Sequence, residues 1–321
     1  MSELEQRDFR ELAAAFSLGE FVASHRIWAG TVNINYRVET TQGTFFLRIN
    51  QGKEEGEVRY EIDVLEYFVA NQVVTPLPKV SQSGQRYYKY LEYLISVFDW
   101  QEGKHVDSKT IEDKDCEMLG AALGRLHSCE SVPEAMLRES RYSDTDLRTR
   151  FGSFSRSPDR ELAVAISAIE VELSYLESVQ AGRGSLARGL IHADLFPDNV
   201  IVQDERLVLL DFEQACAGHY VYDLAVAVNA WCFSERFEKS RLVAMLTSYS
   251  QAAPLSVNLG ELLVELRASA LRFLITRITD VYLQPAVSPT DLQAKDFRRF
   301  LMRLDYWRTL DSRAIAELAQ L

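Results

Sequence analysis

The chain has 321 residues, of which 47% are hydrophobic and 26% charged, so it is long enough for two globular domains or one bilobal unit. Its net charge of −12 argues against nucleic acid as a partner, because binding to a phosphate backbone needs a basic surface. No apolar run is long enough to span a membrane, and residues 1–5 lack the apolar core of a signal peptide. The four cysteines lack metal-finger spacing, which indicates reduced thiols in a cytoplasmic protein.

The N-terminal part of the chain carries the pattern of a small antiparallel sheet with one helix. Apolar residues alternate with polar ones over 36–40 and again over 45–49, with a Thr-Gln-Gly turn between them, which predicts a β-hairpin. Apolar residues then recur at helical spacing over 56–71. Two further strands are predicted at 86–90 and 93–98.

The remainder of the chain is predicted to be mainly helical. Amphipathic helices are expected over residues 110–129, 158–179, 221–233, 238–250, 259–282 and 292–310, with short strands between them near 190–210. The predicted fold class is therefore α+β and bilobal. Its parts are an N-terminal nucleotide-binding lobe (1–98), a hinge (99–103) and a C-terminal helical lobe for catalysis and substrate (104–321). A cleft between two such lobes is a natural nucleotide site.

One segment concentrates chemistry-bearing residues after short apolar runs. Asp194 follows the run at 190–191, and Asn199 comes five residues later. Asp211 follows a second apolar run at 207–210. This inventory suits phosphoryl transfer, which needs a residue that positions the nucleophile and oxygen ligands for a metal. We therefore predict Asp194 as the catalytic base, with His192 bracing its loop. Asn199 and Asp211 are predicted to hold Mg²⁺, since hard cations prefer oxygen ligands.

A cation and a carboxylate in the N-terminal part extend this interpretation. Arg48 lies on the second strand of the predicted hairpin, and Glu61 lies on the helix that follows. A strand cation that contacts the phosphates of ATP, held by a helix carboxylate, is a recurring device of kinases. The alternative is an exposed strand arginine beside a solvated glutamate.

Three other positions keep two interpretations each. The loop 30–36 has one glycine, and its Asn33 and Asn35 either donate hydrogen bonds to phosphate or only cap a turn. Glu213 is either a further metal-site residue or a solvated side chain. Asp223 opens an apolar helix, where a carboxylate is favoured by the helix dipole, and it could also reach back to fix the catalytic loop.

With these residues identified, the chain resembles the superfamily of aminoglycoside phosphotransferases and choline kinases, and within it the bacterial type II homoserine kinases. The segments that carry this resemblance are Ile191–Val200, Tyr222–Phe233, Ala270–Arg277 and Asn33–Tyr36. The Asp211-Phe212 pair also matches protein kinases, although Glu213 replaces the glycine expected there. The resemblance implies a protein-kinase-like fold. It matches Asp194 to the catalytic base, Asn199 and Asp211 to the Mg²⁺ ligands, and Arg48 to the phosphate-binding cation.

The implied reaction is transfer of the γ-phosphoryl group of ATP to the hydroxyl of L-homoserine, which forms O-phosphohomoserine for threonine synthesis. The expected partner is a small hydroxylated acceptor that also carries an amine, which an acidic protein would attract. Two alternatives are a kinase of choline, ethanolamine or an aminoglycoside, and a non-catalytic pseudokinase that binds ATP. The pseudokinase alternative requires loss of the base or of the metal ligands, and all three residues are present.

Overall fold

The computed structural model describes residues 4–28, 33–253, 256–285 and 289–319, and the chain divides into two compact units. Unit 1 consists of Met1–Lys104, Ile201–Asp204 and Val208–Glu213, and unit 2 of His105–Val200, Glu205–Leu207 and Gln214–Leu321. A five-stranded antiparallel sheet lies in unit 1 and most of the helices lie in unit 2, which confirms the predicted fold class. The predicted lobe and hinge boundaries remain a prediction.

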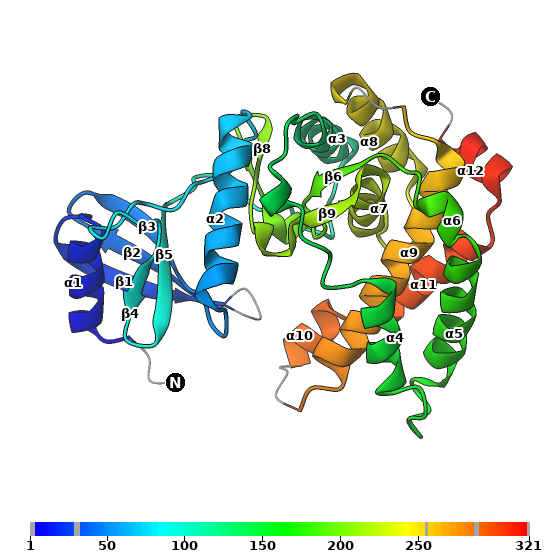
Figure 1. Ribbon diagram of the computed structural model, residues 1–321, viewed down its shortest axis with the longest axis horizontal. Helices are drawn as coiled ribbons and strands as arrows, with labels where there is room; N and C mark the ends of the chain where they lie inside the picture. Colours follow the sequence, from blue (N-terminus) through cyan, green and yellow to red (C-terminus); the bar gives the residue numbers. More distant parts are fainter. Residues whose placement is uncertain (1–3, 29–32, 254–255, 286–288, 320–321) are drawn as a thin grey trace. The chain divides into compact units, whose positions relative to one another are not determined.

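Unit 1 is built around the sheet, whose strand order is β1-β2-β3-β5-β4 (Figure 1). Its elements are α1 (Gln6–Ala15), β1 (Phe21–Ile27), β2 (Ile34–Thr40), β3 (Gly43–Ile49), α2 (Glu55–Ala70), β4 (Tyr88–Tyr90) and β5 (Tyr93–Asp99). The predicted hairpin is present as β2 and β3, with Thr40 opposite Gly43 across a two-residue turn. The predicted helix is α2, and the two later strands are β4 and β5.

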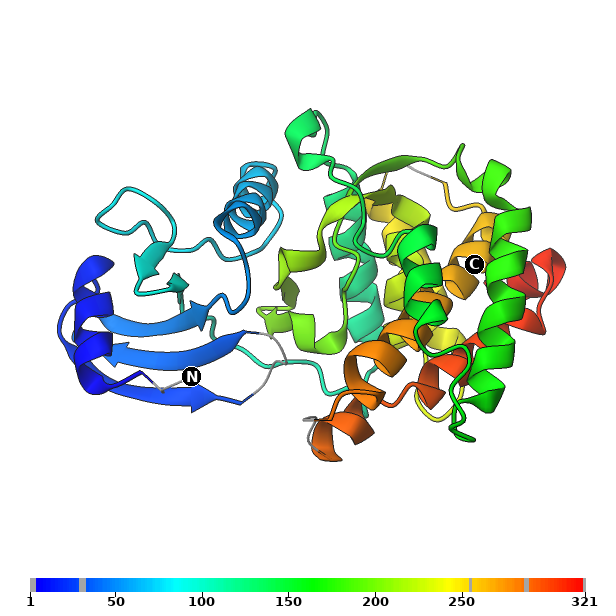
Figure 2. The same cartoon turned by 60° about the horizontal axis from the view of Figure 1, so that its bottom comes forward.

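The two faces of this sheet have different chemistry because side chains alternate along a strand. One face carries Tyr36, Val38 and Leu47 into an apolar core that α1 covers. The opposite face carries Arg48, and α2 lies on that side of the sheet (Figures 1 and 2). Alternation along β3 thus places a cation on the side that also receives the α2 carboxylates.

Two elements of unit 1 were not predicted. Helix α1 has its apolar residues at helical spacing, and Glu5 and Asp8 form a capping box at its start, so its signal is present in the sequence. Strand β1 lacks clear alternation because its pairing with β2 is irregular between Phe21 and Ala23.

Unit 2 is a helical assembly around the long helix α9. Its elements are α3 (Asp113–His127), α4 (Asp144–Gly152), α5 (Ala163–Ser178), α6 (Gln180–Arg183), β6 (Arg188–Ile191), β9 (Cys216–His219), α7 (Tyr220–Trp231), α8 (Lys239–Ala252), α9 (Leu259–Arg277), a π-helical turn (Ile278–Tyr282), α10 (Pro289–Ala294), α11 (Arg298–Arg308) and α12 (Ser312–Leu318). Helix α9 contacts α4, α5, α7, α11 and α12 (Figure 1). Strands β6 and β9 pair with each other. Strand β7 (Val200–Gln203) pairs with β8 (Arg206–Leu209), and residues 201–204 and 208–209 of this hairpin belong to unit 1.

The predicted helices of unit 2 are present with two refinements. The predicted helix 259–282 ends its α-helical part at Arg277 and continues as the π-helical turn. The predicted helix 292–310 is divided into α10 and α11. The short helices α4, α6 and α12 were not predicted, because helices of this length show little periodicity.

Helices α3 and α8 approach each other closely at two glycines. A Cβ atom on Gly120 would lie 2.2 Å from the carbonyl oxygen of Met245, and one on Gly124 would lie 2.6 Å from the Cβ of Ala252. Contacts this short are not possible between unbonded atoms, so both positions need glycine for the observed packing.

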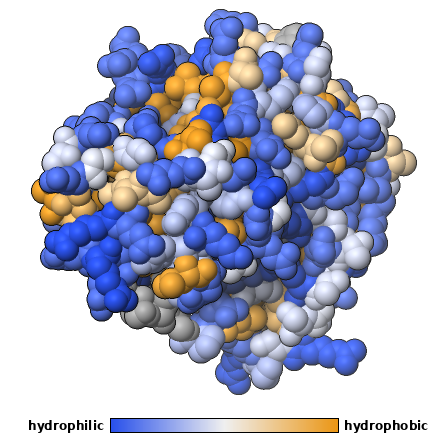
Figure 3. Space-filling model, turned by 60° about the vertical axis from the view of Figure 1, so that its left-hand side comes forward, coloured by the Kyte–Doolittle hydropathy of each residue, from blue (hydrophilic) through white to orange (hydrophobic). Residues whose placement is uncertain are grey.

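The cysteines form no disulfide within the described residues, and the surface in view is mainly hydrophilic (Figure 3). The four cysteines are free thiols, three of them buried. Among the described helices, none combines the length and the apolar character needed to cross a membrane. Figure 3 shows a mainly hydrophilic face on which hydrophobic residues form several patches.

Candidate active site

A buried carboxylate fixes the backbone of the predicted catalytic loop in unit 2. The loop leaves β6, and Ala193 takes the left-handed conformation with φ 64°. Asp223, in the first turn of α7, accepts hydrogen bonds from the backbone N–H groups of His192 (2.8 Å) and Ala193 (2.7 Å). His127 lies 3.1 Å from the same carboxylate. The interpretation of Asp223 as a residue that reaches back to this loop is therefore confirmed.

Asp223 is charged although it is fully buried. Burial would raise its pKa, but hydrogen bonds from His127 and from the His192 N–H outweigh burial and hold the pKa below its usual value. A buried carboxylate with these donors is costly to remove, because the N–H groups would lose their partners. The loop conformation thus depends on a buried carboxylate that bonds to the loop backbone.

A buried arginine holds the same loop through its carbonyl oxygen. Arg272 of α9 donates to the carbonyl oxygen of Ala193 at 2.6 Å, and its guanidinium lies 3.5 Å from Oδ1 of Asp194. Asn199 donates from Nδ2 to the carbonyl oxygen of Asp194 at 2.7 Å. The Trp231 indole donates to the carbonyl oxygen of Leu195 at 3.0 Å. The backbone carbonyl oxygens of Asp194 and of the residues before and after it therefore all accept side-chain hydrogen bonds.

The side chain of Asp194 is partly exposed, and its surroundings act on its pKa in opposite directions. Burial raises the pKa of Asp194 above its usual value, while Arg272 and His192 act in the opposite direction. A raised pKa makes a carboxylate a better proton acceptor while it remains ionised near neutral pH. His192 is buried, and its Nδ1 lies 3.3 Å from the Asp194 backbone N–H. His192, Asp194 and Asn199 thus lie together, as predicted.

A second cluster of charged residues lies in unit 1. Arg48 and Glu61 form the ion pair that the sequence predicted, with 2.8 Å between Nη1 and Oε1. The same guanidinium lies 3.8 Å from Asp211. Lys53 joins this cluster, 3.0 Å from Glu61 and 2.9 Å from Glu213. Glu213 is therefore not a solvated side chain but part of an ion-pair network.

The cations of this cluster are strongly held. Burial would lower the pKa of Arg48 and of Lys53, but the surrounding carboxylates, Glu61 first, outweigh burial and raise both pKa values. In the same way, Lys53 and Arg48 lower the pKa of Glu213 against the effect of burial. Arg48 and Lys53 are thus fixed positive charges, one on β3 and the other just before α2.

The cluster has one negative charge in excess. Glu61, Asp211 and Glu213 face two cations, and Asp211 is the least compensated of the three carboxylates. Its buried Oδ1 has no hydrogen-bond partner among the described residues, although Arg48 lies 3.8 Å away. Burial raises the pKa of Asp211 to about 7, and Glu213 adds to this effect while Arg48 opposes it. An added cation beside Asp211 would remove this imbalance.

The donor set at these positions fits Mg²⁺ in its common mode in phosphotransferases. Within the described residues, no three His, Cys, Asp or Glu side chains converge as a ready-made metal site. Mg²⁺ usually binds through one or two protein oxygens and completes its shell with water and substrate phosphates. Asp211 in unit 1 and Asn199 in unit 2 each carry a side-chain oxygen of the type that Mg²⁺ accepts.

The two predicted asparagines have different surroundings. Asn33 donates from Nδ2 to Glu213 at 3.3 Å, and its buried Oδ1 has no hydrogen-bond partner in the described part of the chain. Asn35 lies opposite Arg48 in the register of β2 and β3. The three residues 30–32 of the predicted phosphate loop fall outside the described residues.

The sequence interpretation missed Lys53, Arg272 and the ion-pair role of Glu213. Lys53 lies in a short turn before α2, where a lone lysine carries no periodic signal. Arg272 belongs to one of the segments that carried the resemblance, but the sequence gives no sign that it reaches the catalytic loop, 79 residues away. The missed residues are all partners of residues that were predicted.

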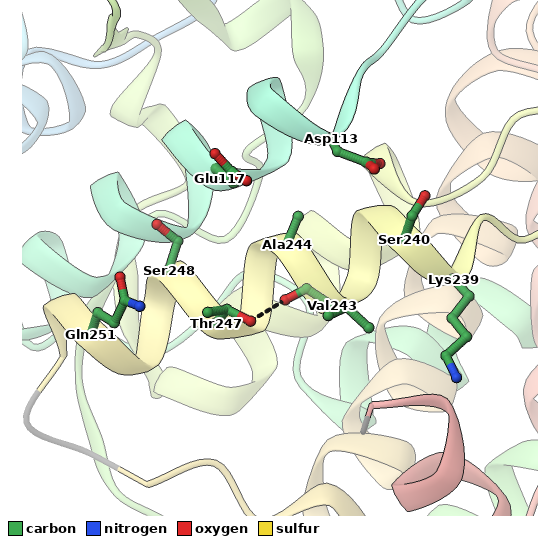
Figure 4. Close-up of a pocket in the computed structure, with 9 residues that line it drawn as sticks. All are labelled: Asp113, Glu117, Lys239, Ser240, Val243, Ala244, Thr247, Ser248 and Gln251. Carbon is green, nitrogen blue, oxygen red and sulfur yellow. Dashed lines mark hydrogen bonds between the residues drawn. The ribbon is translucent and has the colours of Figure 1, made fainter. Parts of the chain in front are cut away.

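A groove between α3 and α8 is lined by a different set of residues (Figure 4). Its lining consists of Asp113, Glu117, Lys239, Ser240, Val243, Ala244, Thr247, Ser248 and Gln251. The Thr247 hydroxyl already donates to the Val243 carbonyl oxygen of its own helix, at 2.7 Å. None of the predicted site residues lines this groove, so it is not the candidate active site.

Comparisons with known proteins identify the class of this chain. Residues 25–255 match the model of the phosphotransferase enzyme family, and the chain belongs to this family. It is 30% identical to a homoserine kinase of Xanthobacter autotrophicus, over 97% of this chain and 96% of that protein. A homoserine kinase of Parvibaculum lavamentivorans is 28% identical over 98% of this chain and 97% of that protein.

Solved structures show the same fold at lower identity. An amicoumacin kinase in complex with AMP-PNP, Ca²⁺ and Ami superposes with a TM-score of 0.72 and 16% identity, covering 95% of this chain and 94% of that one. A choline kinase of Streptococcus pneumoniae gives a TM-score of 0.66 at 17% identity, covering 94% and 99%. The predictions of the superfamily, of its fold and of an enzyme that phosphorylates an alcohol group are therefore confirmed.

Proposed function

We propose that this protein is an ATP-dependent kinase that phosphorylates the side-chain hydroxyl of L-homoserine, forming O-phospho-L-homoserine for threonine synthesis. The observation that carries this proposal is the similarity to homoserine kinases along almost the entire chain. The ordered loop around Asp194 and Asn199 supports catalysis rather than a pseudokinase role.

In unit 2, Asp194 is the proposed base for the acceptor hydroxyl. Asp223 and Arg272 hold the loop backbone from its N–H and its C=O groups, so that the carboxylate keeps one orientation. Such positioning is the main protein contribution to phosphoryl transfer, whose transition state needs little covalent chemistry from the enzyme. As the acceptor oxygen forms its bond to the γ-phosphorus, the bond between that phosphorus and the β–γ bridging oxygen breaks, ADP leaves, and the hydroxyl proton passes to an Asp194 oxygen.

In unit 1, Arg48 and Lys53 are the proposed phosphate cations, and Glu61 orients both of them. We assign nucleotide binding to the predicted lobe 1–98 and acceptor binding to 104–321. Mg²⁺, when bound with ATP, neutralises charge on the β- and γ-phosphates, and Asn199 and Asp211 are its proposed ligands. Asn33 and Asn35 are proposed to assist at the phosphates.

A kinase of choline, ethanolamine or an aminoglycoside is the second candidate, because solved kinases of such acceptors share the fold. The test is an acceptor panel with MgATP and L-homoserine, choline, ethanolamine or an aminoglycoside, read as ADP release and as the phosphorus NMR signal of the product. We expect turnover with L-homoserine. ADP release that only another acceptor stimulates would overturn the homoserine assignment and leave the kinase assignment intact.

A further inference from the structure

Some arginines of unit 2 are paired with carboxylates, and others form no ion pair with the described residues. Arg183 forms a two-bond pair with Glu265 (2.7 and 3.0 Å), and Arg267 forms one with Glu172 (2.7 and 2.9 Å). Arg303 on α11 and Arg277 at the end of α9 have no ion pair with any described residue. Arg303 is buried and Arg277 is half-buried, so both differ from Arg183 and Arg267, each of which is held by two bonds to one carboxylate.

Arg303 is deeply buried without a polar partner for its Nε. Its residue exposure is 8%, and the Nε atom makes no hydrogen bond within the described chain. Its guanidinium carbon lies 4.5 Å from the centroid of the Phe300 ring and 5.4 Å from that of Phe233. Ring contacts compensate only part of the cost of a buried charge, which normally requires a hydrogen-bonded anion.

The surroundings of both arginines disfavour their positive charge. Burial lowers the pKa of Arg303 to about 9, and repulsion from Arg299 and Arg277 acts in the same direction. Burial also lowers the pKa of Arg277, although Asp194 and Asp198 oppose it. By contrast, their partners raise the pKa values of Arg183 and Arg272.

The unpaired arginines adjoin the catalytic loop through a chain of aromatic rings. Phe196, two residues after Asp194, lies 5.7 Å from the Arg277 guanidinium carbon. Its ring centroid is 4.8 Å from that of Phe273 and 6.2 Å from that of Phe300, the ring that Arg303 covers. Cations and apolar walls are thus combined beside the residue proposed to activate the hydroxyl.

We propose that Arg303 and Arg277 form the subsite that binds the carboxylate of the acceptor, with the rings of Phe196, Phe273 and Phe300 beside its methylene chain. This inference rests on the proposed function, and it names the groups that select an acidic acceptor over choline or ethanolamine. A guanidinium matches a carboxylate with two parallel hydrogen bonds. An acceptor without a carboxylate leaves the buried arginines unpaired, which is an effective means of rejection.

The test compares L-homoserine with L-homoserine amide, which keeps the hydroxyl and the amine but lacks the carboxylate. For the wild type, we expect kcat/KM to favour L-homoserine by on the order of 100-fold. In Arg303→Gln, the KM for L-homoserine rises by a similar factor, the preference over the amide collapses, and the KM for ATP is unchanged. Arg313→Gln, an exposed arginine on α12, is the matched control and leaves both acceptors within about twofold of the wild type.

Thermal unfolding separates a binding role from a structural one. Because Arg303 has no anionic partner in the part of the chain that the structure describes, Arg303→Gln leaves Tm unchanged or raises it. L-homoserine then no longer raises Tm as it does in the wild type. Arg277→Gln, at a less buried position, is the second variant and shows the same loss of preference. An equal loss for both acceptors, a raised KM for ATP, or a lowered Tm with the preference retained would overturn the subsite. A wild type that phosphorylates an acceptor without a carboxylate but not L-homoserine would instead refute the proposed function, and the subsite with it.

Discussion

At the scale of single residues, the catalytic loop shows how opposite charges can hold one backbone turn. Asp223 binds two of its N–H groups, and Arg272 binds the carbonyl oxygen of Ala193, whose φ is 64°. A non-glycine residue in the left-handed region carries a conformational cost, which persists only where surrounding contacts determine it. The protein's own contacts therefore order this loop without a substrate, and they fix the backbone position of Asp194.

If Asp194 is the base, catalysis depends on its negative charge, and an uncharged side chain of the same size cannot replace it. We expect Asp194→Asn to lower kcat by about 10²- to 10⁴-fold, because the amide cannot accept the hydroxyl proton. The dissociation constant for ATP should stay within about twofold of the wild type, measured by calorimetry. Asp204→Asn, in the exposed turn between β7 and β8, is the matched control. Turnover close to wild type in Asp194→Asn would remove Asp194 from the role of base.

The sequence alone was sufficient to predict which residues lie near one another where those residues belong to one loop or to consecutive elements. Asp194 and Asn199 are five residues apart on one loop, and Arg48 and Glu61 belong to consecutive elements. Lys53 was not predicted because its role depends on Glu213, which lies far along the chain but forms a 2.9 Å ion pair with it. Arg303 was not predicted because what distinguishes it is the absence of a partner among the described residues, which only the three-dimensional packing reveals.

At the scale of elements, periodicity predicted the amphipathic helices but gave no information on how closely they pack. Helix α3 was predicted from its apolar spacing, and the structure adds that Gly120 and Gly124 face α8 at backbone contact. Helix α1 could have been recognised from its capping box and apolar stripe. Strand β1 could not, because its irregular pairing removes the alternation that identifies a strand.

The close approach of α3 and α8 predicts a position that tolerates no side chain. In Gly120→Ala, the added Cβ would meet the Met245 carbonyl oxygen at 2.2 Å, and backbone atoms cannot yield without separating the helices. We expect the free energy of unfolding to fall by about 2–3 kcal/mol, measured by urea denaturation. Gly152→Ala is the matched control, since nothing lies within 4 Å of its Cβ position. Equal stability of the two variants would show that α3 and α8 do not pack as described.

At the scale of the whole molecule, an acidic protein concentrates cations where its proposed ligands are anionic. The net charge is −12, yet unit 1 gathers Arg48 and Lys53 in one cluster, and unit 2 keeps Arg277 and Arg303 unpaired within its described residues. The first pair is held by carboxylates and suits the phosphates of a nucleotide bound with a divalent cation. The second pair lacks such carboxylates and suits a single organic anion.

This division of charge predicts that the binding of ATP and the binding of the acceptor can be weakened independently. In Arg48→Met, we expect the KM for ATP to rise by about tenfold or more while the KM for the acceptor changes by less than about twofold, measured by steady-state kinetics. The fold should survive, because Lys53 still pairs with Glu61. Arg37→Met, on the neighbouring strand and paired with Glu39, is the matched control and leaves both KM values unchanged.

Combining this change with Arg303→Gln tests the division directly. Sites that share no partner contribute additively to free energy, so the double variant should show the tenfold effect on ATP and the hundredfold effect on the acceptor, each as in the single variants. A KM for the acceptor that rises in Arg48→Met, or fold-changes that fail to multiply in the double variant, would mean that one group of arginines serves both ligands. The separate assignment of nucleotide and acceptor binding to the two units would then be wrong.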